Sequence, residues 1–467
     1  MVGQATRPRR GRRGRRSRRR VRVRPQQTVT RISRCSLGRA PGRYPRPVAQ
    51  RVPAADELPA GLAIRERILT AVERHSALAA GAVWAVWLAA VLGVVIGGVE
   101  AGAISDPHHN WPHYGGPLWP FFTWDFGWYD SVAAHGYPHG QGGPVYAFFP
   151  FWPLVLRASG SIPDWAAAFA VVVAASGLAF LGVAASTPSG QARRAALALA
   201  CWPGSFMLLL AYPDVVALAA AAWAAALVLR GRPYLAGVLG AVAAAARPTG
   251  VLIAIPLFFV ARGTVARAVA AGAPLAAAAA VEIYFWQQSG DPRAFIHAQE
   301  LPIWQRNGPS RLSKWPGHLA HAFDVHAGLL VAAALVGAAL VVVVARWASR
   351  WHAAALAYAF VVGALLLGAQ TTQTRMQSVV LAIAVPAVGL LWWLGPRYRP
   401  WALFATTVIA LSFLSGTVTS FARQALFAFP VYWAVADGPR QLRQPVIAVA
   451  AVVANVAFAL TLAKYAP

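Results

Sequence analysis

Long apolar runs separated by short polar breaks organise the chain after residue 76, and many of the breaks contain Gly or Pro. Gly and Pro interrupt helices, and about 20 apolar residues are needed to cross the hydrocarbon of a bilayer. The pattern therefore predicts an all-α polytopic membrane protein with about thirteen transmembrane helices, several of them short by that standard. The predicted spans are 77–99, 164–186, 195–211, 214–229, 234–246, 249–261, 265–287, 327–345, 353–369, 376–394, 401–418, 425–436 and 445–463.

The distribution of arginine predicts how these spans are oriented. Short cytoplasmic loops of membrane proteins collect Arg and Lys. With a cytoplasmic N-terminus, every predicted inner loop carries an Arg pair, whereas each short outer turn carries at most one Arg. We therefore expect a multi-pass protein of the plasma membrane whose long segments 100–163 and 288–326 lie on the extracytoplasmic side. The inner pairs are Arg193/Arg194, Arg230/Arg232, Arg262/Arg267, Arg346/Arg350, Arg397/Arg399 and Arg440/Arg443.

Composition adds a distinct N-terminal region to this picture. The chain has 42 Lys and Arg against 15 Asp and Glu, and "RPRRGRRGRRSRRRVRVRP" contains no acid. We expect residues 1–76 to be a mostly disordered cytoplasmic tail and residues 77–467 to form one transmembrane domain. The Arg run is compatible with a nucleic-acid-binding arm, but next to a first membrane span it favours retention beside anionic lipid, so no nucleic-acid partner is expected. Two cysteines cannot build a disulfide framework or a zinc site.

Two acids stand out in this acid-poor chain. The segment "FFTWDFGWYDSVAAHGY" at 121–137 places Asp125 and Asp130 among seven aromatic rings. An interfacial belt explains such rings but not an acid among them. The five-residue spacing points the two carboxylates to different sides of a helix, so Asp125 is the functional candidate and Asp130 is interpreted as a solvated or capping residue. The apolar stretch 145–159, broken by prolines, predicts an interfacial helix.

Further charged groups from distant parts of the chain fall on the same predicted outer side. These are Asp214, Arg247, Arg375 and Arg423, and Glu282 inside a predicted span ranks second. Carboxylates act as general bases and guanidiniums bind phosphate through two oxygens, so the set suits chemistry on a phosphorylated lipid. Structural alternatives stay open: Asp214 as a helix cap, and Arg247 as a carbonyl cap or a snorkelling side chain. For Arg375 the structural role is favoured.

The aromatic segment also resembles a known family. "TWDFGWYDSVAAHGYP" followed by "YAFFPFWPLVLR" is similar to the first lumenal loop of the PIG-V-type mannosyltransferases, a group of the GT-C superfamily. "AYPDVVALA" resembles that family's Y-x-E-S-L-F turn, "AARPTG" its R-x-x-G segment, and residues 420–430 its late S-x-x-R-Y…F-P motif. The chain departs from the pattern at Asp214, Val215 and Gln424, where the family has Glu, Ser and an aromatic residue. The resemblance extends from residue 77 to the end.

The resemblance implies a GT-C-like bundle that transfers mannose, with inversion, from a polyprenyl-phosphate-mannose donor to a hydroxyl of a glycan or glycolipid acceptor on the extracytoplasmic face. Asp125 would be the catalytic base, and Arg423, with Arg247 second, would stabilise the leaving phosphate. The bilayer would hold the donor lipid; no cofactor and no metal are expected, and the sequence has no Walker-type nucleotide motif. The implied substrate-binding residues are Trp124, Trp128, Tyr129, Tyr212, Asp214, Arg247 and Arg423.

Three other functions stay open. The first is a transporter or flippase for a lipid-linked sugar, which predicts mid-membrane acids and broken helices at matching positions in two halves; the sequence shows neither clearly. The second is a GT-C enzyme that uses another polyprenyl-linked sugar, such as arabinofuranose. The third is a non-enzymatic scaffold, and this alternative stays open because Asp214 and Val215 differ from the family motif.

Overall fold

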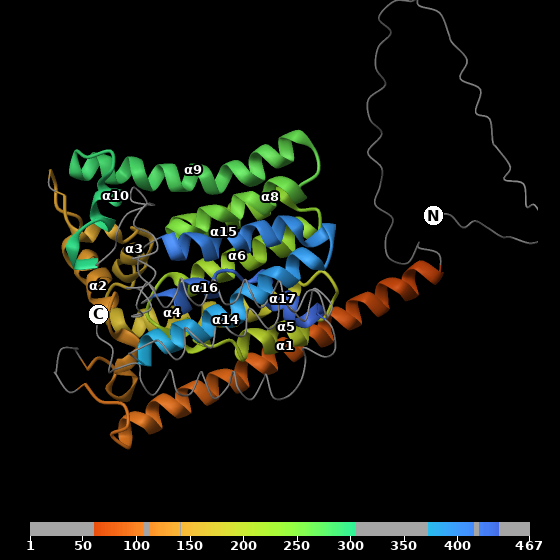
Figure 1. The fold of residues 1–467 in the computed structure, drawn as a ribbon, viewed down its shortest axis with the longest axis horizontal. Helices are drawn as coiled ribbons and strands as arrows, with labels where there is room; N and C mark the ends of the chain where they lie inside the picture. Colours follow the sequence, from red (N-terminus) through yellow and green to blue (C-terminus); the bar gives the residue numbers. More distant parts are fainter. Residues whose placement is uncertain (1–59, 107–112, 141, 305–371, 415–419, 439–467) are drawn as a thin grey trace, which may run out of the picture. The chain divides into compact units, whose positions relative to one another are not determined.

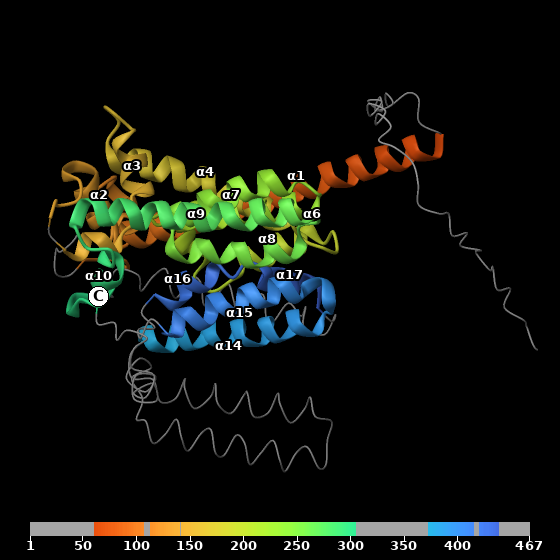
Figure 2. The same ribbon diagram turned by 90° about the horizontal axis from the view of Figure 1, so that it is seen from above.

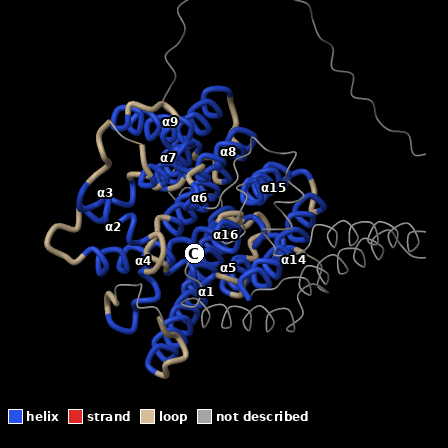
Figure 3. The backbone as a smooth tube through the Cα atoms, turned by 60° about the vertical axis from the view of Figure 1, so that its left-hand side comes forward, coloured by secondary structure: helices blue, strands red, loops and turns tan. Residues whose placement is uncertain are grey.

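The computed structural model describes residues 60–106, 113–140, 142–304, 372–414 and 420–438, and none of these residues forms a strand (Figures 1 and 3). Three of the described helices are long and apolar enough to cross a membrane. They are Ser76–Glu100 within α1 (Ala60–Glu100), α4 (Asp164–Ala185) and α9 (Thr264–Ser289). The expectation of an all-helical membrane protein is thereby confirmed, and the count of about thirteen spans stays a prediction.

The chain divides into two compact units, Met1–Ala63 and Ile64–Pro467. Helix α1 begins at Ala60, well before the predicted start of the first span at residue 77. The predicted division between tail and membrane domain therefore falls inside a continuous helix, and the domain assignment itself stays a prediction. The predicted spans 327–345, 353–369 and 445–463 lie outside the described residues.

Several predicted spans coincide with helices to within a few residues. The reason is visible in the sequence, because each of these spans is an apolar run with residues near its start that suit the beginning of a helix. For example, α6 begins directly after Pro213, and α7 begins at Pro233. The matching helices are α4, α6 (Asp214–Leu229), α7 (Pro233–Ala246), α9, α14 (Thr372–Trp393) and α15 (Arg399–Leu414).

The predicted span 195–211 is wrong. It consists of α5 (Ala192–Ala200) and the 3-10 helix η4 (Ser205–Leu209), separated by a turn in which Gly204 has a φ of 87°. That left-handed conformation favours glycine and ends a helix. The nine residues of α5 make a helix of only about 14 Å, which is too short to cross the hydrocarbon.

Two further predicted spans are also broken into shorter pieces. The segment 249–261 contains η5 (Pro248–Ile253) and α8 (Ala254–Val260). The segment 425–436 contains the end of α16 (Phe421–Leu426) and α17 (Pro430–Asp437), where Pro430 cannot continue the hydrogen-bond ladder of the preceding helix. Breaks of this kind leave irregular backbone inside the bundle, and they occur next to the charged groups described below.

Small residues let the central helices approach closely. Helix α6 packs between α4 and α7, and α7 packs on α9, so that these helices run side by side (Figures 1 and 2). A Cβ added at Gly237 of α7 would lie 3.1 Å from the Ala270 Cα atom and 3.1 Å from the Val269 carbonyl oxygen of α9. Glycine is therefore needed at this crossing, as in other tightly packed membrane helices.

Short elements gather at one end of the bundle, on the left in Figure 1. The stretch predicted as an interfacial helix forms η3 and α3, and its position relative to a membrane stays a prediction. The Trp152 Nε1 atom donates to the Ala211 carbonyl oxygen (2.9 Å), and the Ala211 N–H donates to the Phe121 carbonyl oxygen (2.9 Å). These bonds fix the aromatic segment against the turn before α6. The short elements are η2 (Gly116–Phe122), α2 (Phe126–His135), η3 (Pro144–Ala147), α3 (Phe151–Arg157), α10 (Ala294–Gln299) and η6 (Pro302–Trp304).

Candidate active site

The backbone just before α2 is bent so that the Asp125 side chain leaves the helix. Trp124 has a φ of 54°, and it is the single non-glycine residue with a positive φ in the described part of the chain. A bulky residue rarely adopts this conformation unless its surroundings impose it. The Tyr212 hydroxyl holds the bend, because it donates to the Thr123 carbonyl oxygen (2.6 Å) and accepts from the Asp125 N–H (3.1 Å). The Asp125 carboxylate caps no backbone N–H of α2.

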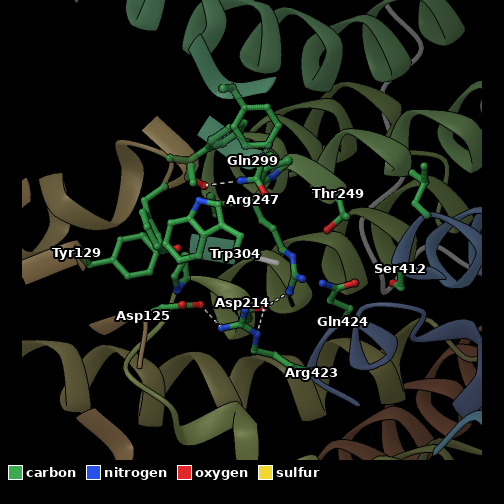
Figure 4. Close-up of a pocket in the computed structure, with 18 residues that line it drawn as sticks. Asp125, Tyr129, Asp214, Arg247, Thr249, Gln299, Trp304, Ser412, Arg423 and Gln424 are labelled. Carbon is green, nitrogen blue, oxygen red and sulfur yellow. Dashed lines mark hydrogen bonds and ion pairs between the residues drawn. The ribbon is translucent and has the colours of Figure 1, made fainter. Parts of the chain in front are cut away.

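Four charged side chains from distant segments form an alternating chain of carboxylates and guanidiniums (Figure 4). Arg423 Nη1 donates to Asp125 Oδ2 at 2.5 Å, and Arg423 Nε lies 3.8 Å from Asp214 Oδ1. Arg247 Nη1 pairs with the same Asp214 oxygen. The four side chains are between 11% and 25% exposed. The four charges sum to zero and are largely removed from water. Each charge is therefore stabilised by its oppositely charged neighbours, and loss of one neighbour would leave a buried charge unpaired.

Local geometry explains how Asp214 and Arg247 meet. Asp214 is the first residue of α6, and Pro213 occupies the N-cap position before it. The Asp214 carboxylate pairs with Arg247 and lies near Arg423, so its position in the first turn of α6 is combined with ion pairing. Arg247 ends α7 in an extended conformation, and the Gly250 N–H donates back to the Arg247 carbonyl oxygen at 2.8 Å. A Cβ atom at Gly250 would overlap the carbonyl oxygen of Ala243. Glycine at this position therefore allows the turn that carries Arg247 to its partner.

The protonation states of the neighbouring groups follow from burial and from the charges. Burial raises the pKa of Tyr129 and of Tyr212, and the Asp125 carboxylate raises both further. Both phenols therefore keep their protons at neutral pH. Burial is the largest single effect on the pKa of Arg423 and lowers it, but the charge and hydrogen bond of Asp125, together with Tyr212 and Tyr129, outweigh burial. The pKa of Arg423 therefore lies above the ordinary value, and the guanidinium stays charged. The guanidinium carbon also lies 5.0 Å from the centre of the Tyr212 ring, within range of a cation–π interaction.

A cavity of about 190 Å³ opens beside the four charges. Its wall also contains neutral polar side chains, including those of Thr249, Gln299, Trp304, Ser412 and Gln424 (Figure 4). Thr249 Oγ1, Trp304 Nε1 and Arg423 Nε are buried without a hydrogen-bond partner among the described residues. Buried polar atoms in proteins are nearly always paired, so three side chains with unpaired atoms on one cavity wall indicate a site built for a polar ligand.

The structure brings together most of the residues that the sequence singled out. Asp125, Tyr129, Asp214, Arg247 and Arg423 all line the cavity. The other implied substrate-binding residues, Trp124, Trp128 and Tyr212, are not part of its wall. Trp128 packs behind the wall, and Tyr212 lies beneath the Arg423 guanidinium. Contact of these three with a substrate stays a prediction, as do the roles assigned to the five that line the cavity.

The remaining acids and histidines of the described residues do not line the cavity. Asp130 is not part of the wall, in agreement with the helical spacing, but it is half-buried rather than solvated. Burial, and then the nearby Asp164 carboxylate, raise the pKa of Asp130. The side chain of Arg375 lies outside the described part of the structure. Within that part, no group of three or more His, Cys, Asp and Glu side chains is placed to hold a metal ion.

Sequence reasoning missed the neutral polar wall of the cavity. Thr249 lies within the quoted "AARPTG" and Gln424 follows Arg423, so proximity to a candidate charge was an available signal for these two. Ser412 is a polar residue near the end of an apolar helix, which is a weaker signal. Gln299 and Trp304 come from the second long outer segment, whose position against the first could not be read from the sequence.

Comparison with known proteins identifies a class of enzyme. Residues 143–369 match the family model of glycosyltransferase family 87, a range of just under half of the chain. The range includes Asp214, Arg247 and Trp304, whereas Asp125 and Arg423 lie outside it. No curated protein sequence matches the chain. The family match supports a glycosyltransferase and the apolar helices support a membrane-embedded protein. The mannose donor, the acceptor and the PIG-V-type grouping are not established by the match.

Proposed function

We propose that the protein transfers mannose from a polyprenyl-phosphate-mannose donor to a hydroxyl group of a glycan or glycolipid on the extracytoplasmic face of the plasma membrane, with inversion at the anomeric carbon. The observation that carries the proposal is the contact of Asp125 with Arg423 beside a cavity that also contains Asp214 and Arg247. A carboxylate next to two guanidiniums supplies both a base and a phosphate site. The family match supports glycosyl transfer, and the choice of mannose rests on the resemblance of the aromatic segment.

The reaction makes two demands on these side chains. The acceptor oxygen attacks the anomeric carbon, and its proton passes to the Asp125 carboxylate. The bond between the anomeric carbon and the phosphate oxygen breaks at the same time, and the leaving polyprenyl phosphate gains negative charge. Arg423 and Arg247 are suited to stabilise that charge, because a guanidinium stays charged and donates to two oxygens at once. Arg423 contacts Asp125, so its contact with phosphate requires it to shift or to share its donors.

The neighbours of the charges support this division of roles. Asp214 pairs with Arg247 and lies near Arg423, so one carboxylate holds both guanidiniums toward the cavity. The rings of Phe149 and Phe295 also line the cavity and provide an apolar surface on which the first isoprene units of a donor lipid can pack. The cavity therefore offers charged, polar and apolar surfaces together, as a phosphorylated glycolipid requires.

A transfer assay on the purified protein tests the proposal. Wild-type protein in liposomes is supplied with radiolabelled polyprenyl-phosphate-mannose and a membrane lipid extract as acceptor. We expect a labelled product whose new linkage has the opposite anomeric configuration to the donor. Parallel reactions contain polyprenyl-phosphate-linked arabinofuranose or glucose, and we expect mannose to be preferred. Asp125→Asn should lower kcat by about 10² to 10⁴, the usual contribution of a general base.

Asp130→Asn is a matched control, since Asp130 lies on the same helix but not on the cavity wall. It should keep wild-type turnover. If Asp125→Asn keeps wild-type turnover as well, Asp125 is not the base. If wild-type protein moves the labelled lipid between leaflets without forming a product, the transporter alternative replaces the transferase.

A further inference from the structure

Trp304 reaches the cavity through a segment that is fixed against the Asp125 side of the site. Gln299 at the end of α10 donates from Nε2 to the Ala147 carbonyl oxygen (3.2 Å), and the Trp304 N–H donates to the Leu301 carbonyl oxygen (3.0 Å). The Trp304 indole packs edge-on against Trp128 and Phe148, with ring centres 5.7 Å and 5.5 Å apart. Trp128 is stacked on Phe148 in turn, at 5.9 Å.

Phe148 and Trp304, which line the cavity, and Trp128 behind them are called the aromatic wall below. The aromatic wall lies on the side of the cavity next to Asp125, the proposed base. Trp128 lies on α2, the helix that Asp125 precedes, and in Figure 4 the Trp304 indole lies on the same side of the Arg247 side chain as Asp125 and Tyr129.

The indole N–H of Trp304 makes no hydrogen bond to the described residues. Trp304 Nε1 is buried and unpaired within that part of the structure, and the Trp304 side chain lines the cavity. A buried donor left unpaired destabilises the folded protein, so a ligand that accepts from it gains affinity. Trp401 provides a comparison, because its Nε1 atom is also unpaired but its ring packs against Phe429 and Trp433 away from the cavity. The unpaired N–H belongs to a side chain of the cavity wall at Trp304 and not at Trp401.

We infer that the aromatic wall is the subsite for the acceptor sugar, and that the Trp304 N–H donates to a hydroxyl of that sugar. The inference rests on the proposed function, because the side of the site next to the base is by definition where the acceptor hydroxyl lies. A pyranose ring is a fitting ligand, since it presents an apolar face for an aromatic ring and a hydroxyl for the indole donor. Thr249, whose hydroxyl is also unpaired among the described residues, lies on the other side of the Arg247 side chain from Trp304 in Figure 4.

Trp304→Phe tests the inference, since phenylalanine keeps an aromatic ring and removes only the N–H donor and part of the ring. The acceptor probe is methyl α-D-mannopyranoside and the donor is polyprenyl-phosphate-mannose. We expect the KM for methyl mannoside to rise about fivefold, as loss of one hydrogen bond produces, with the donor KM changed by less than about twofold. Trp401→Phe is the matched control and should change neither KM.

A calorimetric titration of the full-length protein with methyl mannoside, without donor, separates the inference from the proposed function. Binding that is about fivefold weaker in Trp304→Phe than in wild type supports the subsite even if wild type transfers no mannose. Equal binding by the two proteins, or no binding by wild type, overturns the inference. A rise in the donor KM with an unchanged acceptor KM also overturns it, because the aromatic wall would then hold the donor.

Discussion

Replacing Arg423 with glutamine removes the guanidinium that lies between two carboxylates of the candidate active site. Its Nη1 atom is 2.5 Å from the nearest Asp125 oxygen, and its Nε atom is 3.8 Å from Asp214. With an effective dielectric constant near 20, unit charges at these separations attract by about 7 and about 4 kcal/mol. Desolvation of the buried groups offsets much of that attraction, and breaking one buried pair destabilises a protein by about 3–5 kcal/mol. We expect a loss of about 3 kcal/mol, because Asp214 keeps Arg247 as a partner.

The kcat of Arg423→Gln should fall as well, because the leaving phosphate loses a positively charged hydrogen-bond donor. Loss of one such donor lowers kcat by about 10² to 10³. Arg423→Lys separates charge from geometry: it restores a positive charge, but a single ammonium cannot donate toward Asp125 and Asp214 in the way that a guanidinium does. The lysine variant should therefore regain most of the lost stability and remain at least about tenfold slower than wild type.

Two measurements check the Arg423 variants. Chemical denaturation in nanodiscs gives the free energy of unfolding, and the mannose-transfer assay gives kcat. If Arg423→Gln has wild-type kcat and wild-type stability, the ion pair with Asp125 has neither of the roles assigned to it. If Arg423→Lys is as fast as wild type, only the charge matters and the two-oxygen geometry does not.

Three further variants test the support of the site and of the fold. Tyr212→Phe removes the hydroxyl that fixes the backbone at Asp125, so kcat should fall by about tenfold with little change in donor KM, by steady-state kinetics. Gly250→Ala places a methyl group against backbone and should destabilise the protein by at least about 2 kcal/mol, by chemical denaturation. Tyr398→Phe removes the 2.6 Å hydrogen bond to the Asp437 carboxylate and should cost about 1.5–3 kcal/mol at pH 8. Burial, and then the bond to Asp437, raise the pKa of Tyr398 from 10.0 to about 12, so its stabilising effect is complete below pH 10 and lost as pH rises through 12.

For each of these variants, a control variant or a specific result would contradict the prediction. Gly272→Ala lies in a helix with open space at the added Cβ and should not destabilise the protein. Equal effects at Gly250 and Gly272 would contradict the close-approach argument. A donor KM that rises with unchanged kcat in Tyr212→Phe would mean that the hydroxyl serves binding rather than the position of Asp125. For Tyr398→Phe, a stability difference that widens between pH 10 and pH 12 would reverse the expected sign.

The helices could be predicted from the sequence where an apolar run is uninterrupted. Such runs predicted the bounds of α6 correctly and those of α9 to within two residues, because hydrophobicity and helical periodicity are properties of residues close together in the sequence. The run at 195–211 was predicted wrongly because its composition is apolar throughout, and composition alone does not show that Gly204 adopts a left-handed turn. Breaks of this kind depend on tertiary contacts that a local pattern does not contain.

The candidate site also contains residues that could be predicted from the sequence and residues that could not. Asp125 and Arg423 could be proposed because an acid and an arginine beside apolar runs need a partner, and a family resemblance indicated which ones. The alternating order of the four charges could not be predicted, since Arg247 could have paired with either carboxylate. Trp304 was missed because an isolated tryptophan in a long loop has no pattern around it, and only the folded chain shows its indole on the cavity wall.

A structure of the protein with polyprenyl phosphate bound would show whether Asp125 and Arg423 share a substrate site. We expect phosphate oxygens within hydrogen-bonding distance of Arg423 or Arg247, and the Asp125 carboxylate in the same cavity with space for a sugar ring between them. A phosphate bound elsewhere, with Arg423 still paired only to Asp125 and Asp214, would contradict this expectation.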